Sequence, residues 1–285
     1  AEKSQEREQK TTALYMIGES QFQKGDWLNA IKTFTSLDIQ SLSREEQREG
    51  LYKTGYAYYK LNQKRGAVEA WEKLLSLYPD LQGKRQLLLA LGDSYQSLGK
   101  CREAVDKYQP LVEGNEKDDL RYEALLRLSY CYQQIGQRED SLAMLKRLNN
   151  EKPSAETSLQ MGLLLYQKGE HKLALEPFKT AGESLNSSLA AEATFGLAEA
   201  YYSLGEYAKA SETLQSLISR FPTENLWLEL AYSRLGGLYE MEEKWASALE
   251  VYKNVLDLSK DEKLLSKARE SIERIQNYLK ASSQK

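Results

Sequence analysis

Apolar residues recur along most of the chain at the spacing of an amphipathic α-helix. Leu88, Leu91 and Tyr95 follow one another at i, i+3 and i+7, which places them on one face of a helix. A second apolar stripe of the same kind follows around Ala104 and Tyr108. The pattern therefore predicts pairs of helices, each pair joined by a short turn.

These helical pairs recur as seven similar units. Each unit has an alanine or serine on its second stripe, twelve residues after a small residue on its first stripe. The alanine-type positions are Ala30, Ala67, Ala104, Ser141, Ala174, Ala210 and Ala248. The small residues are Gly18, Gly55, Gly92, Ser129, Gly162, Ala198 and Gly236, at intervals of 37, 37, 37, 33, 36 and 38 residues. Repetition at this period indicates an array of stacked units.

Glycine and proline positions explain where the helices should end. Five units carry Gly seven residues after the small residue, where a positive φ would end the first helix. These are Gly25, Gly99, Gly136, Gly169 and Gly205. Pro79, Pro153 and Pro222 share one register at the expected end of the second helix. Pro110 and Pro177 instead fall inside second helices, where we expect a kink or an early end, with a functional hinge as the alternative.

The segments LGDSYQSLGKCREAVDKY and LAEAYYSLGEYAKASETL resemble the tetratricopeptide repeat (TPR) family. That 34-residue pattern has Leu-Gly and Tyr on the first helix, then Ala, an aromatic residue and a closing Pro. Gln21 and Leu165 depart from it where Tyr is usual. The resemblance implies an all-α fold, a right-handed superhelical solenoid of about seven helix-turn-helix units plus a C-terminal capping helix.

The repeat divides the chain into three parts. Residues 1–10 form a polar N-terminal extension, either a frayed start or a solvated continuation of the first helix. Residues 11–258 hold the seven repeats, which start near 11, 48, 85, 122, 155, 191 and 229. Residues 259–285 form a capping helix and tail. Ser43 with Glu46, and Ser259 with Glu262, have the spacing of capping boxes that begin helices.

Composition narrows the classes of function. The 285 residues carry 39 basic and 42 acidic side chains, a formal charge of −3, which argues against nucleic-acid binding. No run of about 18 apolar residues predicts a membrane span. One His and two Cys leave almost no ligands for a metal site. We therefore expect neither a metal nor another cofactor.

The few chemically reactive residues do not form a recognisable active site. His171 is more typical of a packing or surface residue than of a catalytic base. Cys101 and Cys131 are expected as free buried thiols, with a disulfide as the alternative. The stretch from Gly92 to Lys100 lacks the spacing of a phosphate loop. The sequence therefore predicts no catalytic residues, and we expect that the protein is not an enzyme.

In the TPR family a concave groove is lined by the first helix of each unit. If the small residue is numbered as the eighth position of its unit, the resemblance places groove residues near positions 2, 5, 9 and 12. The groove residues expected on this basis are Tyr15, Glu19, Phe22, Tyr52, Tyr56, Tyr59, Tyr130, Tyr166, Phe195, Glu199 and Tyr202. Aromatic side chains offer large contact areas for peptide recognition. The alternative is that several of these rings pack between neighbouring repeats. Tyr15 and Glu19 also replace the Lys and Asn with which co-chaperone repeats hold chaperone tails, so that role is not expected.

Two functions remain from these observations. The first is a non-catalytic scaffold that binds an extended or helical segment of another protein, alone or within a larger multiprotein assembly. The second is a regulatory sensor that closes around a small ligand or signalling peptide, with Pro110 and Pro177 as hinges. The endings Tyr78-Pro79 and Phe221-Pro222 resemble bacterial cell-envelope TPR proteins, which favours the periplasm, with the cytoplasm as the alternative. The Ala-Glu start is consistent with a removed signal peptide or with a trimmed chain.

Overall fold

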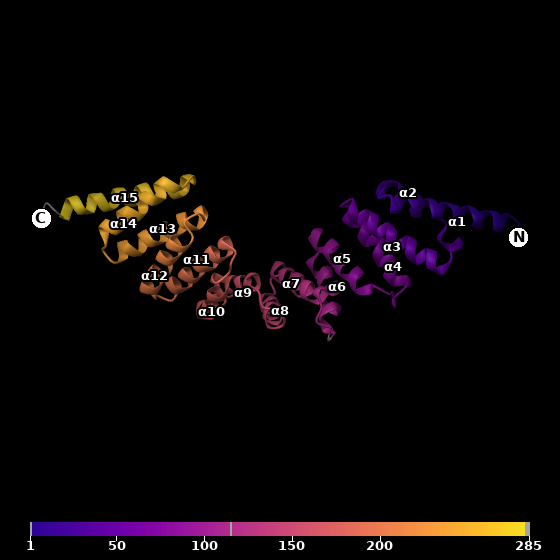
Figure 1. Ribbon diagram of the computed structural model, residues 1–285, viewed down its shortest axis with the longest axis horizontal. Helices are drawn as coiled ribbons and strands as arrows, with labels where there is room; N and C mark the ends of the chain where they lie inside the picture. Colours follow the sequence, from indigo (N-terminus) through magenta and orange to yellow (C-terminus); the bar gives the residue numbers. More distant parts are fainter. Residues whose placement is uncertain (1, 115, 283–285) are drawn as a thin grey trace. The chain divides into compact units, whose positions relative to one another are not determined.

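The computed structural model describes residues 2–114 and 116–282 and shows a chain of helical hairpins (Figure 1). Within these residues every regular element is a helix, so the predicted all-α fold is confirmed. Two compact units divide the chain, residues 1–144 and residues 145–285. Each unit is described by itself.

Unit 1 consists of three helical hairpins followed by a further first helix. Its elements are α1 (Glu2–Gln23), α2 (Trp27–Ser36), the 3-10 helix η1 (Ile39–Ser41), α3 (Arg44–Lys60), α4 (Lys64–Leu77), α5 (Lys84–Ser97), α6 (Cys101–Glu113), α7 (Asp119–Gln134) and the start of α8 (Arg138–Glu151). Helices contact their hairpin partners in the pairs α1 with α2, α3 with α4, and α5 with α6. Each second helix also contacts the first helix of the next hairpin, as α4 contacts α5. The core therefore runs along the stack instead of forming one central cluster.

Unit 2 repeats this arrangement after the end of α8. Its elements are α9 (Ala155–Gln167), α10 (His171–Gly182), α11 (Ser187–Ser203), α12 (Tyr207–Arg220), α13 (Asn225–Met241), α14 (Trp245–Leu258) and α15 (Glu262–Ser282). The last helix, α15, packs on α14 and buries Ala268 and Ile275 against it. Between Glu262 and Asn277 every exposed residue of α15 is polar. A terminal helix with a polar outer face ends a stack of repeats without leaving its core open.

In five hairpins the small residue of the first helix is a glycine that lies beneath an aromatic residue of the partner helix. A Cβ atom added to Gly92 would lie 2.4 Å from a ring carbon of Tyr108, which is completely buried. The same close approach occurs between Gly162 and Phe178. Where the second helix carries the narrower Leu214, the first helix has Ala198, and both belong to one core cluster. Residue size at the two positions is therefore matched within each hairpin.

Every turn inside a hairpin contains a residue with positive φ at the same repeat position. The five glycines predicted there have φ between 72° and 80°. In the two units that lack Gly, Asn62 has φ of 58° and Glu243 has φ of 56°. The geometry of the turn is therefore kept even where the residue that favours it is absent.

One of the two predicted capping boxes is wrong. Ser43 and Glu46 form the expected reciprocal pair at the start of α3. At α15, however, Asp261 is the cap, because its Oδ1 accepts from the backbone N–H of Lys263 at 2.7 Å and of Leu264 at 3.3 Å. The predicted Ser259 cap instead donates to Glu229 and accepts from the N–H of Asp261. Asp261 directly precedes the first residue of α15, and its carboxylate is stabilised there by the positive end of the helix dipole.

Of the two outcomes expected at Pro110 and Pro177, a kink or an early end of the helix, the second does not occur at the proline itself. Helix α6 passes through Pro110 and continues to Glu113, and α10 passes through Pro177 and continues to Gly182. Each proline removes one backbone hydrogen bond, because it lacks a single N–H, and the residues after it stay helical.

Candidate functional site

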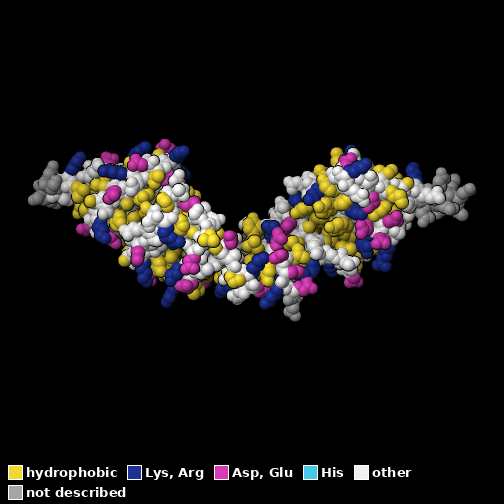
Figure 2. Space-filling view, in the orientation of Figure 1, with side chains coloured by type: hydrophobic (Ala, Val, Ile, Leu, Met, Phe, Trp, Pro, Cys, Tyr) yellow, Lys and Arg dark blue, Asp and Glu magenta, His cyan; other side chains and the backbone are white. Residues whose placement is uncertain are grey.

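The first helices of the hairpins form a layer of their own. In unit 1, α1 contacts α3 and α5 contacts α7, and in unit 2, α11 contacts both α9 and α13. These contacts join helices that are two elements apart in the chain. Figure 2 shows hydrophobic side chains gathered over α3 and α5. Two pockets lie between those two helices.

A pocket of about 400 Å³ lies between α3 and the beginning of α5. The residues that line it are Arg48, Glu49, Tyr52, Lys53, Leu81, Gln82, Gly83 and Gln86. A second pocket, of about 470 Å³, shares Arg48, Leu81 and Gln82 with the first and reaches Tyr78 and Pro79. We call these two pockets together the α3–α5 groove. It follows the connector between α4 and α5, which is longer than the tight turns within the hairpins.

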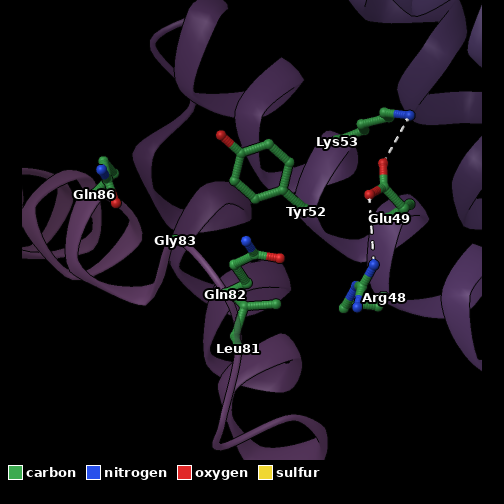
Figure 3. A pocket seen from close by; sticks show the side chains of 8 residues that line it. All are labelled: Arg48, Glu49, Tyr52, Lys53, Leu81, Gln82, Gly83 and Gln86. Atoms are coloured by element: carbon green, nitrogen blue, oxygen red, sulfur yellow. Dashed lines mark ion pairs between the residues drawn. The ribbon is translucent and has the colours of Figure 1, made fainter.

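Tyr52 is the aromatic residue exposed in this groove. Its side chain is 40% exposed and stacks on Tyr56, with ring centroids 6.3 Å apart. Figure 3 shows the ring in the space between α3 and the start of α5. Partial burial, followed by the nearby Tyr56 and Glu49, raises the pKa of Tyr52. Its phenol therefore stays neutral at ordinary pH and presents both an apolar ring and a hydroxyl donor.

A chain of ion pairs lies along α3 beside Tyr52 (Figure 3). The Nζ atom of Lys53 lies 3.1 Å from Glu49 and also contacts Glu19 of α1, while Arg48 lies 3.8 Å from Glu49. Partial burial alone would lower the pKa of Lys53, but hydrogen bonds to Glu19 and Glu49 raise it overall. The charges beside the pocket therefore neutralise one another, which favours an uncharged guest at Tyr52 itself.

The other expected groove residues of unit 1 lie in different surroundings. Tyr15 packs on Phe34 of its own hairpin at 5.9 Å. Phe22 and Tyr56 contact each other across two hairpins at 5.6 Å. Tyr59 contacts Trp71 at 5.7 Å, and Lys64 lies 3.7 Å from its ring centre. Tyr130 of α7 is 46% exposed.

In unit 2 the expected residues form contacts between neighbouring hairpins. The hydroxyl of Tyr166 lies 3.2 Å from that of Ser203, and its ring contacts His171 at 4.8 Å. Phe195 contacts Trp227 of α13 at 5.8 Å.

Arg234 of α13 binds two further residues expected in the groove of unit 2. It forms two hydrogen bonds to Glu199, of 2.5 and 2.6 Å, and lies over the ring of Tyr202 at 4.6 Å.

Sequence reasoning missed a recurring ion pair between first helices. The carboxylates at the ninth position are Glu19, Asp93 and Glu199, and the bases at the sixth position of the next unit are Lys53, Arg127 and Arg234. Arg127 lies 3.2 Å from Asp93. The acid-to-base intervals of 34 or 35 residues were visible in the sequence. These carboxylates are therefore engaged in joining hairpins.

The remaining reactive side chains are buried or packed. Cys101 and Cys131 are free and buried, and burial raises the pKa of the Cys131 thiol. His171 is partly buried against Tyr166. In residues 2–114 and 116–282, no three His, Cys, Asp or Glu side chains come together as a metal site. Over the same residues, no helix is both long enough and apolar enough to span a membrane.

Comparisons with known families agree with this geometry. Sequence models of the tetratricopeptide repeat family match residues 123–154, 159–225 and 231–266. A model of a family described as outer membrane lipoprotein matches residues 7–98. No curated protein matches the chain. Together with the hairpins and their residue columns, these matches show that the chain belongs to the tetratricopeptide repeat proteins.

Several solved structures share the fold. The C-terminal part of a TPR repeat-containing protein from Cytophaga hutchinsonii is 16% identical, with a TM-score of 0.68, and the match covers 88% of this chain and 98% of that one. A tetratricopeptide repeat protein from Parabacteroides merdae is 23% identical, with a TM-score of 0.56 and coverage of 81% and 87%. YrrB, described as a TPR protein with an unusual peptide-binding site, is 18% identical, with a TM-score of 0.54 and coverage of 72% and 100%. Tetratricopeptide repeats are scaffolds for protein–protein interaction and are generally non-catalytic.

Proposed function

We propose that the protein binds an extended or helical segment of another protein in the α3–α5 groove, as a non-catalytic scaffold. The observation that carries this proposal is the exposed Tyr52 ring at a pocket of about 400 Å³ on the first-helix layer. That volume falls within the range of about 300–1,000 Å³ typical of ligand pockets. The unusual peptide-binding site of YrrB, a protein of the same fold, also supports the proposal.

The groove favours a segment with one large uncharged side chain. Tyr52 and Leu81 offer apolar contact, while the amides of Gln82 and Gln86 are exposed and can bond to a peptide backbone. The ion pairs of Lys53 are already satisfied, so a charged guest side chain would have to displace them. We infer that an aromatic or long aliphatic residue of the partner contacts Tyr52. Within unit 1, Tyr130 and the half-buried Tyr15, Glu19, Phe22, Tyr56 and Tyr59 would then border the bound segment or support the layer. Tyr166, Phe195, Glu199 and Tyr202 belong to unit 2, where we propose that they support its own layer of first helices.

The alternative function as a sensor receives no support from the prolines. Helices α6 and α10 are continuous through Pro110 and Pro177, so neither position interrupts a helix as a hinge would. The scaffold is therefore the function that we propose.

We also propose a location in the bacterial cell envelope, in the periplasm. The match of residues 7–98 to an outer membrane lipoprotein family supports it. The division into a polar extension at 1–10, seven repeats over 11–258 and a capping segment at 259–285 remains our proposed domain scheme.

A paired substitution tests the groove. A photo-crosslinking residue placed at Tyr52 would identify the partner, which is then purified and titrated against the protein by calorimetry. We expect Tyr52→Ala to weaken binding at least about tenfold, the usual loss at an aromatic anchor. Tyr207→Ala is the matched control, because Tyr207 is 39% exposed but lies on α12 in unit 2. Equal affinities for the wild type and Tyr52→Ala would refute the proposal.

A further inference from the structure

The outer face of α1 carries an apolar strip that is covered on every other first helix of unit 1. At the seventh repeat position, Thr54, Leu91 and Leu128 are 7%, 0% and 1% exposed, because the preceding second helix packs on them. Ile17 at the same position of α1 is 50% exposed. Beside it Ala13 is exposed and Met16 is 64% exposed. Among the described residues, this face of α1 is therefore apolar, whereas the outer face of α15 is polar.

On the other first helices of unit 1, the residue eight positions before the small residue donates a hydrogen bond. Gln47 donates to the carbonyl of Leu42 at 2.9 Å. Lys84 donates to the carbonyl of Pro79 at 2.8 Å, just after α4 ends.

The corresponding residue of α7, Arg121, donates to Val112 at 2.9 Å and also to Gly114, where α6 ends. Each of the three donors thus binds a carbonyl at the C-terminal end of the preceding second helix or in the connector that follows it. On α1 the corresponding residue is Lys10, which is exposed.

From these two features we infer that α1 is the docking site for a helix of another polypeptide, which would extend the stack by one second-type helix. The surface is separate from the α3–α5 groove and repeats an interface that unit 1 already uses three times. The docked helix would run with its C-terminal carbonyls at Lys10, since cations are favoured at that end of a helix. Its N-terminal turn would lie near Lys24, which is exposed in the turn directly after α1.

The helices already in place define the chemistry of the occupant. Helix α4 packs against α5 through the apolar residues Val68 and Leu75, which are seven residues apart. Between them, Glu72 accepts a hydrogen bond from the Tyr95 hydroxyl at 2.7 Å. On α1, Gln21 replaces this Tyr; its Oε1 accepts from the Thr33 hydroxyl at 2.7 Å, and its amide N–H groups can donate to a polar residue of a docked helix. We therefore expect an amphipathic helix with two apolar residues seven apart around a polar one. An acidic first turn would suit Lys24.

The test uses the peptide of residues 64–79 as the probe, because Lys84 already binds the carbonyl of its last residue. Ile17→Cys places a thiol on the strip, and the native thiols at Cys101 and Cys131 are buried and slow to react. We expect the peptide, added up to about 1 mM, to slow alkylation of the new thiol about tenfold. Adding Lys10→Glu should remove most of that protection. Leu77→Cys is the control, since Leu77 is 48% exposed on α4.

Three results would overturn the inference. The first is an alkylation rate at position 17 that the peptide does not change. The second is protection without peptide that increases with protein concentration, which would assign the strip to a second copy of the chain. The third is protection without peptide in a chain extended by its own natural upstream residues, which would assign the strip to that segment. Melting curves of both cysteine variants confirm that they fold, as substitution at half-exposed positions should allow.

Discussion

Two glycine-to-alanine substitutions should have opposite effects on stability, although each adds one methyl group within a helix. Gly92 lies beneath the buried Tyr108, and the added Cβ would be 2.4 Å from a ring carbon. Gly237 lies inside α13, where an added Cβ would meet nothing within 4 Å. Helix propensity alone favours Ala over Gly by about 1 kcal/mol at both sites. The difference between the two variants therefore isolates the close approach of the helices in the hairpin.

The expected change in the free energy of unfolding for Gly92→Ala follows from the packing and the hydrogen bonds that the Tyr108 ring would lose. Overpacking a core costs about 1–3 kcal/mol. Moving the Tyr108 ring also disturbs its hydroxyl bonds to Asp93 at 2.7 Å and Gln96 at 3.1 Å, worth about 1 kcal/mol each. After the gain in propensity, we expect Gly92→Ala to lower the free energy of unfolding by about 2 kcal/mol. Gly237→Ala should raise it by about 0.5–1 kcal/mol.

Urea unfolding followed by circular dichroism measures both shifts. A further variant tests the cause, because a leucine, Leu214, stands at the position of the ring where the small residue is Ala198, and both are buried in one core cluster. In a Tyr108→Leu background, Gly92→Ala should therefore lose nearly all of its penalty. Equal shifts for the two glycine variants, or a penalty that persists beneath leucine, would refute the size matching that we describe.

Three further predictions concern the turns, the caps and the response to pH. Glu243→Gly should raise the melting temperature by relieving a positive φ of 56°, a gain of about 1 kcal/mol measurable by calorimetry. Asp261→Ala should destabilise α15 by about 1 kcal/mol, seen as faster amide exchange at Lys263 and Leu264, whereas Asp261→Asn should cost less. Burial, followed by the hydrogen bond to Glu240, raises the pKa of Tyr252 to about 12, whereas an unfolded tyrosine ionises near 10. Its contribution to stability is therefore complete below pH ~10 and is lost as the pH rises to ~12. In Tyr252→Phe the urea midpoint should therefore depend less on pH over that interval.

The hairpins could be predicted from the sequence because their causes are local. The buried alanine column, the small residue beneath each aromatic and the glycine in each turn all lie within one repeat. Gly99, for example, has the positive φ that its place between two apolar stripes predicts. Local rules failed at Ser259, because the choice between it and Asp261 depends on Glu229 of a different helix.

The candidate site was harder to predict because it depends on packing between repeats. The pattern placed Tyr52 and Tyr56 on the same face, yet only Tyr52 borders the pocket, since Tyr56 is taken up by contacts with Phe22 and Trp27 of the preceding hairpin. The pocket also needs Leu81 and Gln82 from the connector, which belong to no repeat column. The conformation of a connector, and the choice of which rings pack together, depend on the folded chain. They cannot be predicted from the spacing of residues in the sequence.

The matched sizes of Gly92 with Tyr108 and of Ala198 with Leu214 limit how such a chain can be recombined. A gene crossover inside a hairpin could place the Ala198 helix against the Tyr108 helix and create a clash that neither parent has. A crossover in a connector would carry both members of each matched pair together. The whole hairpin is therefore the smallest piece that can be duplicated, deleted or exchanged without repacking, and chimeric arrays should be cut between Leu77 and Lys84 instead of at Gly99.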